Sequence, residues 1–269
     1  MPIPNADLAT RVAELKWYHT FDLPGGVTTP GMFDHRRFVT KLPFPASLAG
    51  KRCLDAASAD GFFSFEMARR GADEVVSLDL PDPDAQDFSG VPRKRSWAIG
   101  PGRANQCFAL VREATGLDVE RVDGSVYDLE KMGLGQFDLV FLGNILLHLR
   151  DPIGAVQAVR TVTRGELLSV EPVSFPQTML RPFTPTGQFS LGDENTFWTP
   201  NLCGHRALIR AGGFDVIAAG GPILQPMGSL YPTRPDRAHL PRSLHEVVYW
   251  SFTRPFGKAT SWVRASPIR

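Results

Sequence analysis

One stretch, residues 51–65, constrains the fold of this chain more than any other. It reads KRCLDAASADGFFSF. A short apolar run around Asp55 ends in small residues, which is typical of a buried parallel strand that enters a tight turn. From Gly61 to Gly71 the apolar residues recur at helical spacing, so we expect a helix there. Strand, small-residue turn and helix open a doubly wound α/β fold, in which a ligand would lie across the turn, against the helix N-terminus.

A second predicted strand, residues 74–80, contains the acid Asp79, 18 residues after Gly61. In folds of this kind, an acid about 20 residues past the glycine turn binds ribose hydroxyls. A carboxylate suits that role because it can accept hydrogen bonds from both vicinal hydroxyls. The alternative is that Asp79 only caps the end of its strand. The strand, turn and helix in front of it favour the ribose role.

The glycine pattern of the turn disfavours two common nucleotide sites. A dinucleotide site needs G-x-G-x-x-G so that bare backbone can approach a pyrophosphate, and here those slots hold Ala57, Ser58 and Ala59 before Gly61. A phosphate-binding loop needs a Gly-Lys-Ser/Thr ending, which the turn lacks. Counted from Asp55, the pattern is acid-x-small-x-small-x-Gly. It resembles the first motif of class I S-adenosylmethionine (SAM) methyltransferases, with alanine in two slots that usually hold glycine.

The length and composition fit one decorated α/β domain. The chain has 269 residues, of which 43% are hydrophobic, with 25 glycines and 23 prolines. We expect residues 1–45 to form a helix and a strap or lid, and residues 46–269 to form a Rossmann-like SAM methyltransferase domain with a seven-stranded sheet. Two proline-rich stretches, residues 171–200 and 220–245, break the pattern and are expected to be insertions that form a cap.

The remaining strands and helices follow from apolar runs and their periods. Strands are expected over residues 118–122, 136–142, 165–170, 214–218 and 246–253. Helices are expected over residues 6–17, 103–115, 152–163 and 201–211. The tail, residues 254–269, is basic and carries no clear pattern.

The charge balance and the cysteines limit the function classes. The 29 basic and 28 acidic residues give a net charge of +1, so no overall basic field calls for nucleic acid. The three cysteines are odd in number and widely spaced, which favours reduced thiols in a cytoplasmic protein. The sequence has no C-x-x-C pair and no histidine pair at helical spacing, so we expect no metal site. We also expect no membrane segment, because no apolar run approaches about 18 residues.

Several segments together resemble one branch of the SAM methyltransferases. They are WYHTFDL, TPG, LDAASADGFFSFEMARRGA, VVSLDL, SVYDL, GNILLHLRDP and the W-x-x-N element that begins at Trp198. From about Trp17 to Phe214 the chain is similar to the wobble-uridine tRNA O-methyltransferase family, its carboxymethyl-transferring relatives and related small-molecule methyltransferases. The resemblance implies SAM as the cofactor and S-adenosylhomocysteine (SAH) as the product. It implies that SAM contacts Asp55, Ala57, Gly61, Asp79, Leu80, Ser125, Val126 and Asn144.

The chain also departs from that branch. Relatives that use the carboxylated cofactor carry a lysine and a tryptophan for its extra carboxylate, and a tyrosine one residue before the histidine. This chain has no lysine from Trp17 to Thr40, and Leu147 stands at the tyrosine position. An extra carboxylate would lack its usual partners, so we expect ordinary SAM. The chain also lacks an obvious basic arm for tRNA, which favours a small-molecule acceptor.

Methyl transfer is an in-line displacement, so catalysis depends on aligning the acceptor with the methyl group. A hydroxyl acceptor also gains from a nearby base. His148 and His19 are the candidate bases, and Asn144, four residues before His148, would share its helical face and orient the acceptor. The alternative is that each histidine is structural. The candidate acceptor-binding residues are Trp17, Tyr18, Arg181, Trp198 and Asn201.

The predicted function is therefore SAM-dependent O-methylation of a small-molecule hydroxyl. Two alternatives stay open. One is a tRNA wobble-uridine methyltransferase of the same fold. The other is a non-catalytic SAM-fold binding protein, which the two alanines of the turn would suit. An NAD-dependent reductase is less favoured, because the pyrophosphate turn is missing. The sequence does not distinguish a monomer from a homodimer.

Overall fold

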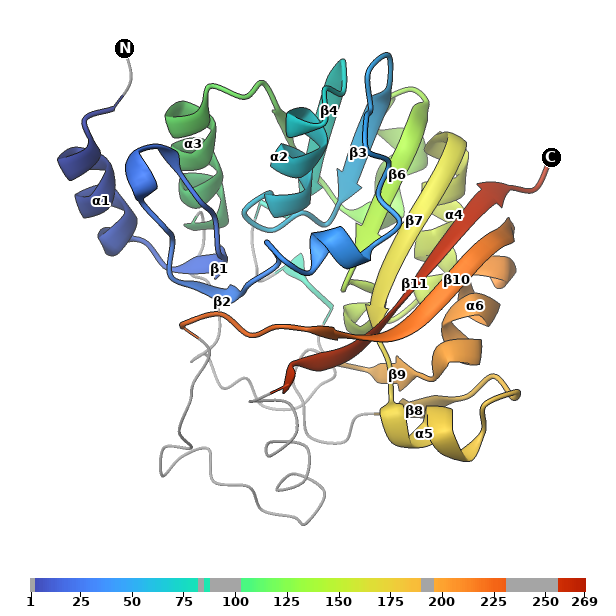
Figure 1. The fold of residues 1–269 in the computed structure, drawn as a ribbon. Coiled ribbons are helices and arrows are strands. Elements are labelled where there is room, and N and C mark those ends of the chain that lie inside the picture. The colour runs from blue at the N-terminus through green and yellow to red at the C-terminus, as the bar shows by residue number, and fades with distance from the viewer. Residues whose placement is uncertain (1–2, 82–84, 88–102, 190–195, 231–255) are drawn as a thin grey trace.

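A seven-stranded sheet forms the centre of the molecule in this computed structural model (Figure 1), which describes residues 3–81, 85–87, 103–189, 196–230 and 256–269. The strand order is β10-β11-β7-β6-β3-β4-β5. From β7 to β5 the neighbours run parallel, whereas β11 is antiparallel to both β7 and β10. This is the Rossmann-like α/β sheet that the sequence predicts. The strands are β3 (Arg52–Ala56), β4 (Glu74–Asp79), β5 (Glu120–Asp123), β6 (Phe137–Gly143), β7 (Thr163–Pro172), β10 (Phe214–Gln225) and β11 (Lys258–Pro267).

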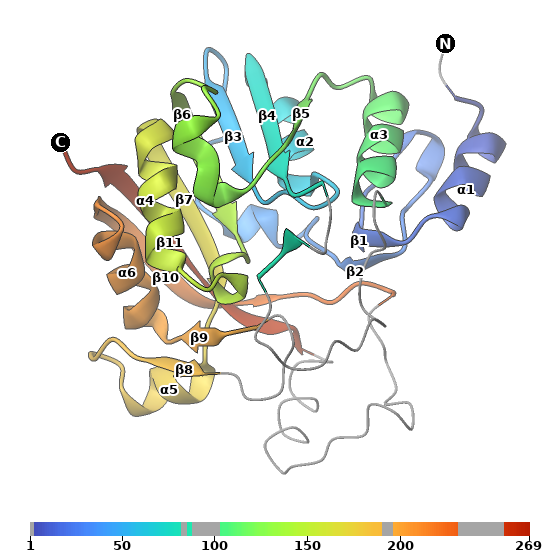
Figure 2. The same cartoon turned by 180° about the vertical axis from the view of Figure 1, so that it is seen from behind.

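Helices cover both faces of the sheet (Figures 1 and 2). On one face, Phe65 of α2 and Phe108 of α3 share a hydrophobic core with residues of α1. On the other face, Val156 of α4 and Ile209 of α6 belong to a second core. A parallel strand between two such cores must be apolar on both sides, which explains the apolar run at residues 139–142 of β6. The helices are α1 (Asn5–Glu14), α2 (Phe62–Arg69), α3 (Arg103–Thr115), α4 (Pro152–Val162) and α6 (Leu202–Ala211).

The seventh strand lies nearer the C-terminus than predicted. β11 occupies most of the tail that we expected to have no pattern, so that expectation is wrong. The strand predicted over residues 246–253 lies outside the described residues. The apolar alternation of β11 is weak because Thr260 and Ser261 are both buried. Its backbone pairs on both sides, with β7 and with β10, and these two ladders hold it in the sheet.

The sixth strand is longer than predicted. β10 continues to Gln225, so residues 220–225 extend the strand and do not begin an insertion. The ladder to β11 shifts register between Gly220 and Ile223, which interrupts the side-chain alternation on which the prediction rested. Residues 231–245 of the predicted insertion lie outside the described part of the chain.

The N-terminal residues form a strap at the edge where the parallel strands end (Figure 1). After α1 the chain forms a parallel pair, β1 (Trp17–His19) and β2 (Gly31–Phe33). The predicted helix over residues 6–17 therefore ends three residues early, because Trp17 belongs to β1. The chain that follows β10 runs beside β2, where Gly228 N donates to Met32 O at 2.7 Å. Two short 3-10 helices, η1 (Pro24–Gly26) and η2 (Val39–Lys41), complete the strap.

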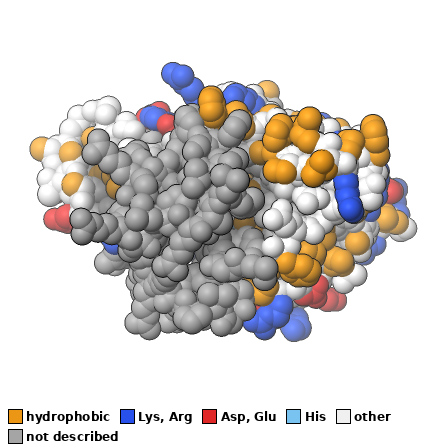
Figure 3. Space-filling view, turned by 90° about the horizontal axis from the view of Figure 1, so that it is seen from below, with side chains coloured by type: hydrophobic (Ala, Val, Ile, Leu, Met, Phe, Trp, Pro, Cys, Tyr) orange, Lys and Arg blue, Asp and Glu red, His pale blue; other side chains and the backbone are white. Residues whose placement is uncertain are grey.

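The expected insertion at residues 171–200 contains α5 (Phe175–Leu180) and a hairpin of β8 (Gly187–Phe189) and β9 (Trp198–Pro200). Apolar side chains gather on this part of the face seen in Figure 3, beside the grey residues. The insertion contributes an exposed apolar surface. Its exposed large side chains are Phe175 (48%), Met179 (66%), Leu180 (76%), Phe183 (93%) and Phe189 (76%).

The described part of the chain carries neither a candidate membrane span nor a candidate metal site. None of its helices has the length and apolar character needed to cross a bilayer. Nor do three or more His, Cys, Asp or Glu side chains converge there in a way that could hold a metal ion.

Candidate functional site

The turn between β3 and α2, residues 57–61, has an alternating left-handed backbone. Ala57, Ala59 and Gly61 have φ values of 68°, 52° and 86°. An L-residue with a side chain pays about 1–2 kcal/mol for this conformation, and glycine does not. Ala57 N and Ser58 N both donate to Leu78 O, at 2.9 and 3.0 Å, which ties the turn to β4. The two alanines thus adopt a backbone conformation that glycine takes without this cost.

Asp79, the last residue of β4, faces this turn. One carboxylate oxygen accepts a hydrogen bond from Ala59 N, and the other accepts from Leu80 N at 2.7 Å. Burial raises the pKa of Asp79, while the charge of Arg121 acts in the opposite direction. Each oxygen keeps a second lone pair for a further donor. The predicted ribose-binding acid is therefore beside the predicted turn.

Arg121 on β5 supports the turn from the edge strand, although it was not predicted as a site residue. Its Nη1 donates to Ser58 Oγ and to Ala59 O, both at 2.8 Å. The guanidinium lies over the Phe108 ring at 5.2 Å. Its Nη2 has no hydrogen-bond partner within the described residues. The signal available in the sequence was a charged residue inside a predicted strand.

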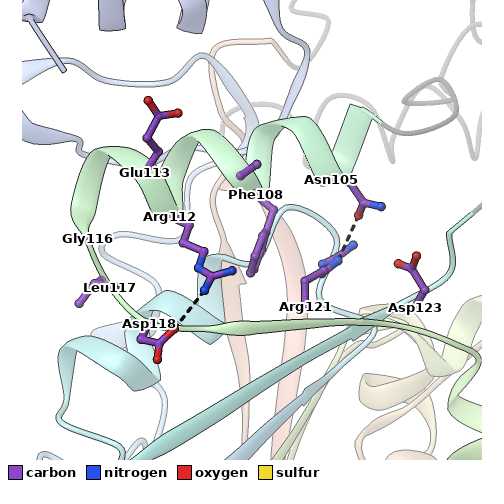
Figure 4. Close-up of a pocket in the computed structure, with 10 residues that line it drawn as sticks. Asn105, Phe108, Arg112, Glu113, Gly116, Leu117, Asp118, Arg121 and Asp123 are labelled. Carbon is purple, nitrogen blue, oxygen red and sulfur yellow. Dashed lines mark hydrogen bonds and ion pairs between the residues drawn. The ribbon is translucent and has the colours of Figure 1, made fainter. Parts of the chain in front are cut away.

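A groove of about 790 Å³ runs between α3 and β5 (Figure 4). Arg121 and Asn105 point toward each other in it, and Nε of Arg121 donates to Asn105 Oδ1 at 3.1 Å. None of the predicted cofactor residues lines this groove. It lies beside the edge strand, and Arg121 connects it to the turn. Its lining residues are Asn105, Phe108, Ala109, Arg112, Glu113, Gly116, Leu117, Asp118, Arg121 and Asp123.

Asp60, inside the turn, holds the strap in place. Its side chain is fully buried. One carboxylate oxygen accepts from both Tyr18 N and His19 N at 2.9 Å, and the other pairs with His19 Nδ1. A single carboxylate therefore binds β1 to the loop that joins β3 to α2. Sequence reasoning missed this residue, because nothing local to Asp60 indicates a partner about 40 residues away.

His19, a predicted base, is buried at this junction. Its ring lies 4.8 Å from the His35 ring and 5.6 Å from the Phe62 ring. His35 Nε2 in turn lies 2.7 Å from Gln225 Nε2, and burial holds the pKa of His35 well below its usual value. With Nδ1 paired to Asp60, His19 has a role in anchoring the strap that requires no ligand.

Tyr18, the neighbour of His19, is only half-buried. Its ring packs on Phe33 with centroids 5.1 Å apart. In the described residues no partner hydrogen-bonds to its hydroxyl. Burial raises the pKa of Tyr18, and the negative charges of Asp60, Asp79 and Glu171 raise it further. The phenol therefore lies within electrostatic reach of the ends of both β4 and β7.

Asn144 and His148 follow β6 but do not share a helical face, so that expectation is wrong. Asn144 has a left-handed backbone, with φ of 55°. The helix that follows, η6 (Leu146–His148), is a single 3-10 turn and begins after it. Asn144 N donates to Val170 O at 2.7 Å, and its Oδ1 is buried with no partner in the described chain. His148 is half-buried at the end of the turn.

Glu171, near the end of β7, was not identified as a site residue. Its side chain is fully buried. One carboxyl oxygen, Oε1, accepts from Ile145 N and Leu146 N, both at 2.9 Å, and Oε2 has no partner in the described chain. Burial raises the pKa of Glu171 to about 8, although these backbone donors oppose the shift. The available signal was an acid that directly follows the predicted strand over residues 165–170.

The other predicted cofactor residues lie around the same strand ends. Asp55 is buried, accepts from Ser64 Oγ at 2.6 Å, and has its pKa raised to about 6 by burial. The loop after β5 lies against β4, where Gly124 N donates to Asp79 O at 2.9 Å. Ser125 caps a 3-10 helix, η5 (Val126–Lys131). Leu80 follows β4, and Val126 begins η5 after the neighbouring strand β5.

The predicted acceptor residues fall into two groups. Trp17, in the strap beside Tyr18, is 1% exposed, and its indole donates to Val12 O at 2.9 Å. In the insertion, Asn201 caps α6 and its amide also donates to Arg181 O and Thr184 O, both at 2.9 Å. Core packing and capping account for the burial of Trp17 and Asn201 without a ligand.

The remaining two residues of the second group lie at the surface of the insertion. Trp198 is half-buried, and its indole donates to Leu149 O at 3.4 Å. Arg181 is exposed. The insertion contacts the turn after β6 directly, because Phe197 N donates to Leu147 O at 2.9 Å. This places Trp198 close to η6.

No protein-family model and no curated protein matches this sequence. Among solved structures, the N-terminal domain of EvdMO1 with SAH bound superposes with a TM-score of 0.57 at 15% identity, covering 100% of this chain and 98% of that one. The cyclase SpnF gives a TM-score of 0.53 at 13% identity, covering 98% and 93%. The Burkholderia thailandensis 1,6-didemethyltoxoflavin-N1-methyltransferase gives 0.50 at 13% identity, covering 81% and 72%. At these identities the similarity establishes the fold, which is that of the class I methyltransferases.

Proposed function

We propose that the protein is a SAM-dependent methyltransferase that transfers a methyl group to a hydroxyl of a small-molecule acceptor. The observation that carries this proposal is the position of Asp79, whose carboxylate faces the left-handed turn at residues 57–61. An acid at that position suits ribose hydroxyls, and a turn without the dinucleotide glycines suits a ligand without phosphates. Two of the fold neighbours were crystallised with SAH.

On this proposal, SAM would lie along the ends of β3, β4, β5 and β6. Asp79 would bind the ribose, Leu80 and Val126 the two faces of the adenine, and Ser125 its edge. Asn144 would lie toward the methionine end, where its unpartnered Oδ1 offers an acceptor for an ammonium group. Asp55, Ala57 and Gly61 would contact the cofactor from the turn and the strand before it. When bound, SAM supplies an electrophilic methyl group on a positively charged sulfur.

The acceptor would bind between the strap and the insertion. Tyr18 fits a role there, because its hydroxyl is without a partner in the described chain and lies near the ends of β4 and β7. Arg181 and Trp198 are the further candidates, whereas Trp17 and Asn201 are both 1% exposed and are held by core packing and capping. His148 would act as the base. Asn144 would serve the methionine end of SAM, because its left-handed backbone sets it apart from the turn that carries His148. His19 would act mainly by anchoring the strap.

The surface of the insertion favours a small molecule over tRNA. RNA binding draws on clustered basic side chains and phosphate contacts, whereas the described insertion exposes phenylalanine, methionine and leucine. The wobble-uridine methyltransferase remains the second candidate, and salt-sensitive tRNA binding would favour it. A protein of this fold with another chemistry is the third, because one fold neighbour is a cyclase and a fold alone does not fix the reaction.

Calorimetric titration with SAM and with SAH tests the proposal. The wild-type protein is expected to bind both, and Asp79→Ala is expected to bind each at least about tenfold more weakly, since a hydrogen bond to a charged group contributes roughly 1.5–3 kcal/mol. Asp73→Ala is the matched control. Asp73 is exposed and precedes β4, whereas Asp79 ends it. Binding of NADH in place of SAM, or unchanged affinity in Asp79→Ala, would contradict the assignment.

A further inference from the structure

Only one of the two carboxyl oxygens of Glu171 has a partner in the described chain. The side chain is fully buried, and the hydrogen bonds from Ile145 N and Leu146 N to Oε1 give it a capping role at the start of η6. The second oxygen, Oε2, is buried as well but has no partner in the described chain. A buried polar atom without a partner costs about 1–3 kcal/mol. Capping η6 needs only Oε1, so it does not explain why Oε2 is buried without a partner.

Glu171 lies two strands away from the turn at residues 57–61, where the cofactor is proposed to bind. β7 neighbours β6, and β6 neighbours β3, whose end leads into the turn at residues 57–61. Adjacent strands lie about 4.8 Å apart, so Glu171 lies roughly 10 Å from that turn across the sheet. Asn144 lies between them and donates to Val170 O, the carbonyl just before Glu171. The negative charges of Glu171 and Asp79 both raise the pKa of Tyr18, so its hydroxyl lies within electrostatic reach of both carboxyl groups.

On the premise that the protein binds SAM as proposed above, we propose that Glu171 is a further cofactor-site residue. Its free oxygen faces the sulfonium of SAM and makes the site prefer charged SAM over neutral SAH. Free of ligand, the carboxyl is mostly neutral at pH 7, since burial raises its pKa to about 8. A cation beside it favours the ionised form. After transfer the sulfur is neutral, so the carboxyl takes up a proton again and the product is held less tightly.

Other groups that face Glu171 belong to several elements. Ser261 lies opposite it on β11, and behind Ser261 is His205 of α6, whose Nδ1 is 2.6 Å from Ser261 Oγ. Burial lowers the pKa of His205 to about 3, so it stays neutral over the range tested below. The strap contributes Tyr18, whose pKa the charge of Glu171 raises. His148 ends η6, the turn whose start Glu171 caps, so the variants must separate Glu171 from His148.

The test needs only SAM and SAH as probes. Affinities of both ligands are measured by calorimetry from pH 6.5 to 9.0 for the wild type, E171Q and E166Q. The amide introduced in E171Q keeps an oxygen acceptor for the two backbone donors but cannot ionise. Glu166 is the matched control, because it lies on the same strand, five residues earlier, and pairs with Arg264 at 3.0 Å. H148Q shows whether the neighbouring imidazole titrates in the same range.

The expected result is a SAM-over-SAH preference that grows about tenfold or more as the pH rises toward 9 in the wild type, E166Q and H148Q, since a nearby opposite charge shifts a pKa by about 1–3 units. In E171Q the preference should keep only the smaller slope that the ligands cause themselves, because their amino and carboxyl groups titrate in every variant. An equal slope in E171Q and wild type, or no slope in the wild type, would overturn the proposal.

A second measurement keeps the proposal testable if E171Q does not fold. SAM binding to the wild type at pH 7.5, titrated in two buffers of different ionisation enthalpy, should release roughly half a proton more than the ligand alone accounts for. SAH binding should release no such excess. An excess of zero with SAM refutes the role of Glu171 while leaving SAM binding intact. Failure of both ligands to bind would instead refute the proposed function.

Discussion

Replacing Asp60 by alanine is predicted to release the strap from the turn. The Asp60 carboxylate is fully buried and accepts hydrogen bonds from Tyr18 N and His19 N at 2.9 Å each, besides its pair with His19 Nδ1. In Asp60→Ala both backbone donors lose their acceptor while the rings around His19 keep water out. Each unpaired buried N–H costs about 1–3 kcal/mol. The expected loss is therefore about 2–6 kcal/mol, a large part of the roughly 5–15 kcal/mol typical of a whole domain.

Two further variants divide this loss into its parts. Asp60→Asn keeps an oxygen that can accept from both backbone amides. It should lower the free energy of unfolding by only about 1–2 kcal/mol, because the hydrogen bonds lose the contribution of the negative charge. Asp73→Ala also removes an acceptor of a backbone hydrogen bond, from Gly50 N at 2.8 Å, but that site is exposed and water can replace the carboxylate. Asp73→Ala should therefore lower the free energy of unfolding by less than about 1 kcal/mol.

Denaturant unfolding gives the free energies, and hydrogen exchange locates the effect. In Asp60→Ala, the amides of Tyr18 and His19 should exchange much faster than in wild type, whereas amides of the central strands change only with global stability. If Asp60→Ala costs no more than Asp73→Ala, or if the two amides stay protected, the carboxylate does not hold the strap. That result would also remove the reason for the burial of His19.

Three other predictions follow from the same region. Ala57→Gly should raise the melting temperature by about 1–3 °C, because glycine relieves the left-handed φ of 68°. Glu171 should lower the unfolding free energy as the pH rises from about 4.5 to 8, by at most about 1.4 kcal/mol per unit, because burial raises its pKa to about 8 and the folded state binds its proton more tightly than the unfolded chain. A denaturation series with E171Q should show a shallower slope, to which Asp55, with its pKa raised to about 6, still contributes below about pH 6. His148→Ala should lower turnover by about 10²–10⁴-fold while calorimetry shows near-normal SAM affinity, and loss of both affinity and fold would make the histidine structural.

The sequence sufficed to predict the parallel core because the signals there are local. The strand, turn and helix around Gly61 and the acid at Asp79 are read from apolar periods and small residues, and both lie where they were expected. β11 was missed because its buried residues include Thr260 and Ser261, and pairing on both edges, not apolar pattern, keeps it in the sheet.

The parts of the site that were missed depend on contacts between distant segments. Asp60 meets the strap, Arg121 reaches the turn from the edge strand, and Glu171 caps the segment after β6. Each is an ordinary charged residue within its own segment. The shared helical face of Asn144 and His148 was predicted from spacing alone. It fails because Asn144 takes a left-handed φ that ends the strand before a single 3-10 turn begins.

The charge at the strand ends argues for a cationic ligand independently of the glycine pattern. Asp55, Asp79 and Glu171 all have a raised pKa, in each case first because of burial. Arg121 reaches the turn but binds the Ala59 carbonyl and serine hydroxyls, so none of these carboxyls is its hydrogen-bond partner there. A pyrophosphate would add negative charge where carboxylates already resist ionisation. A sulfonium with an ammonium group would favour their ionised forms, so the residues that disfavour a dinucleotide are the ones that would stabilise bound SAM.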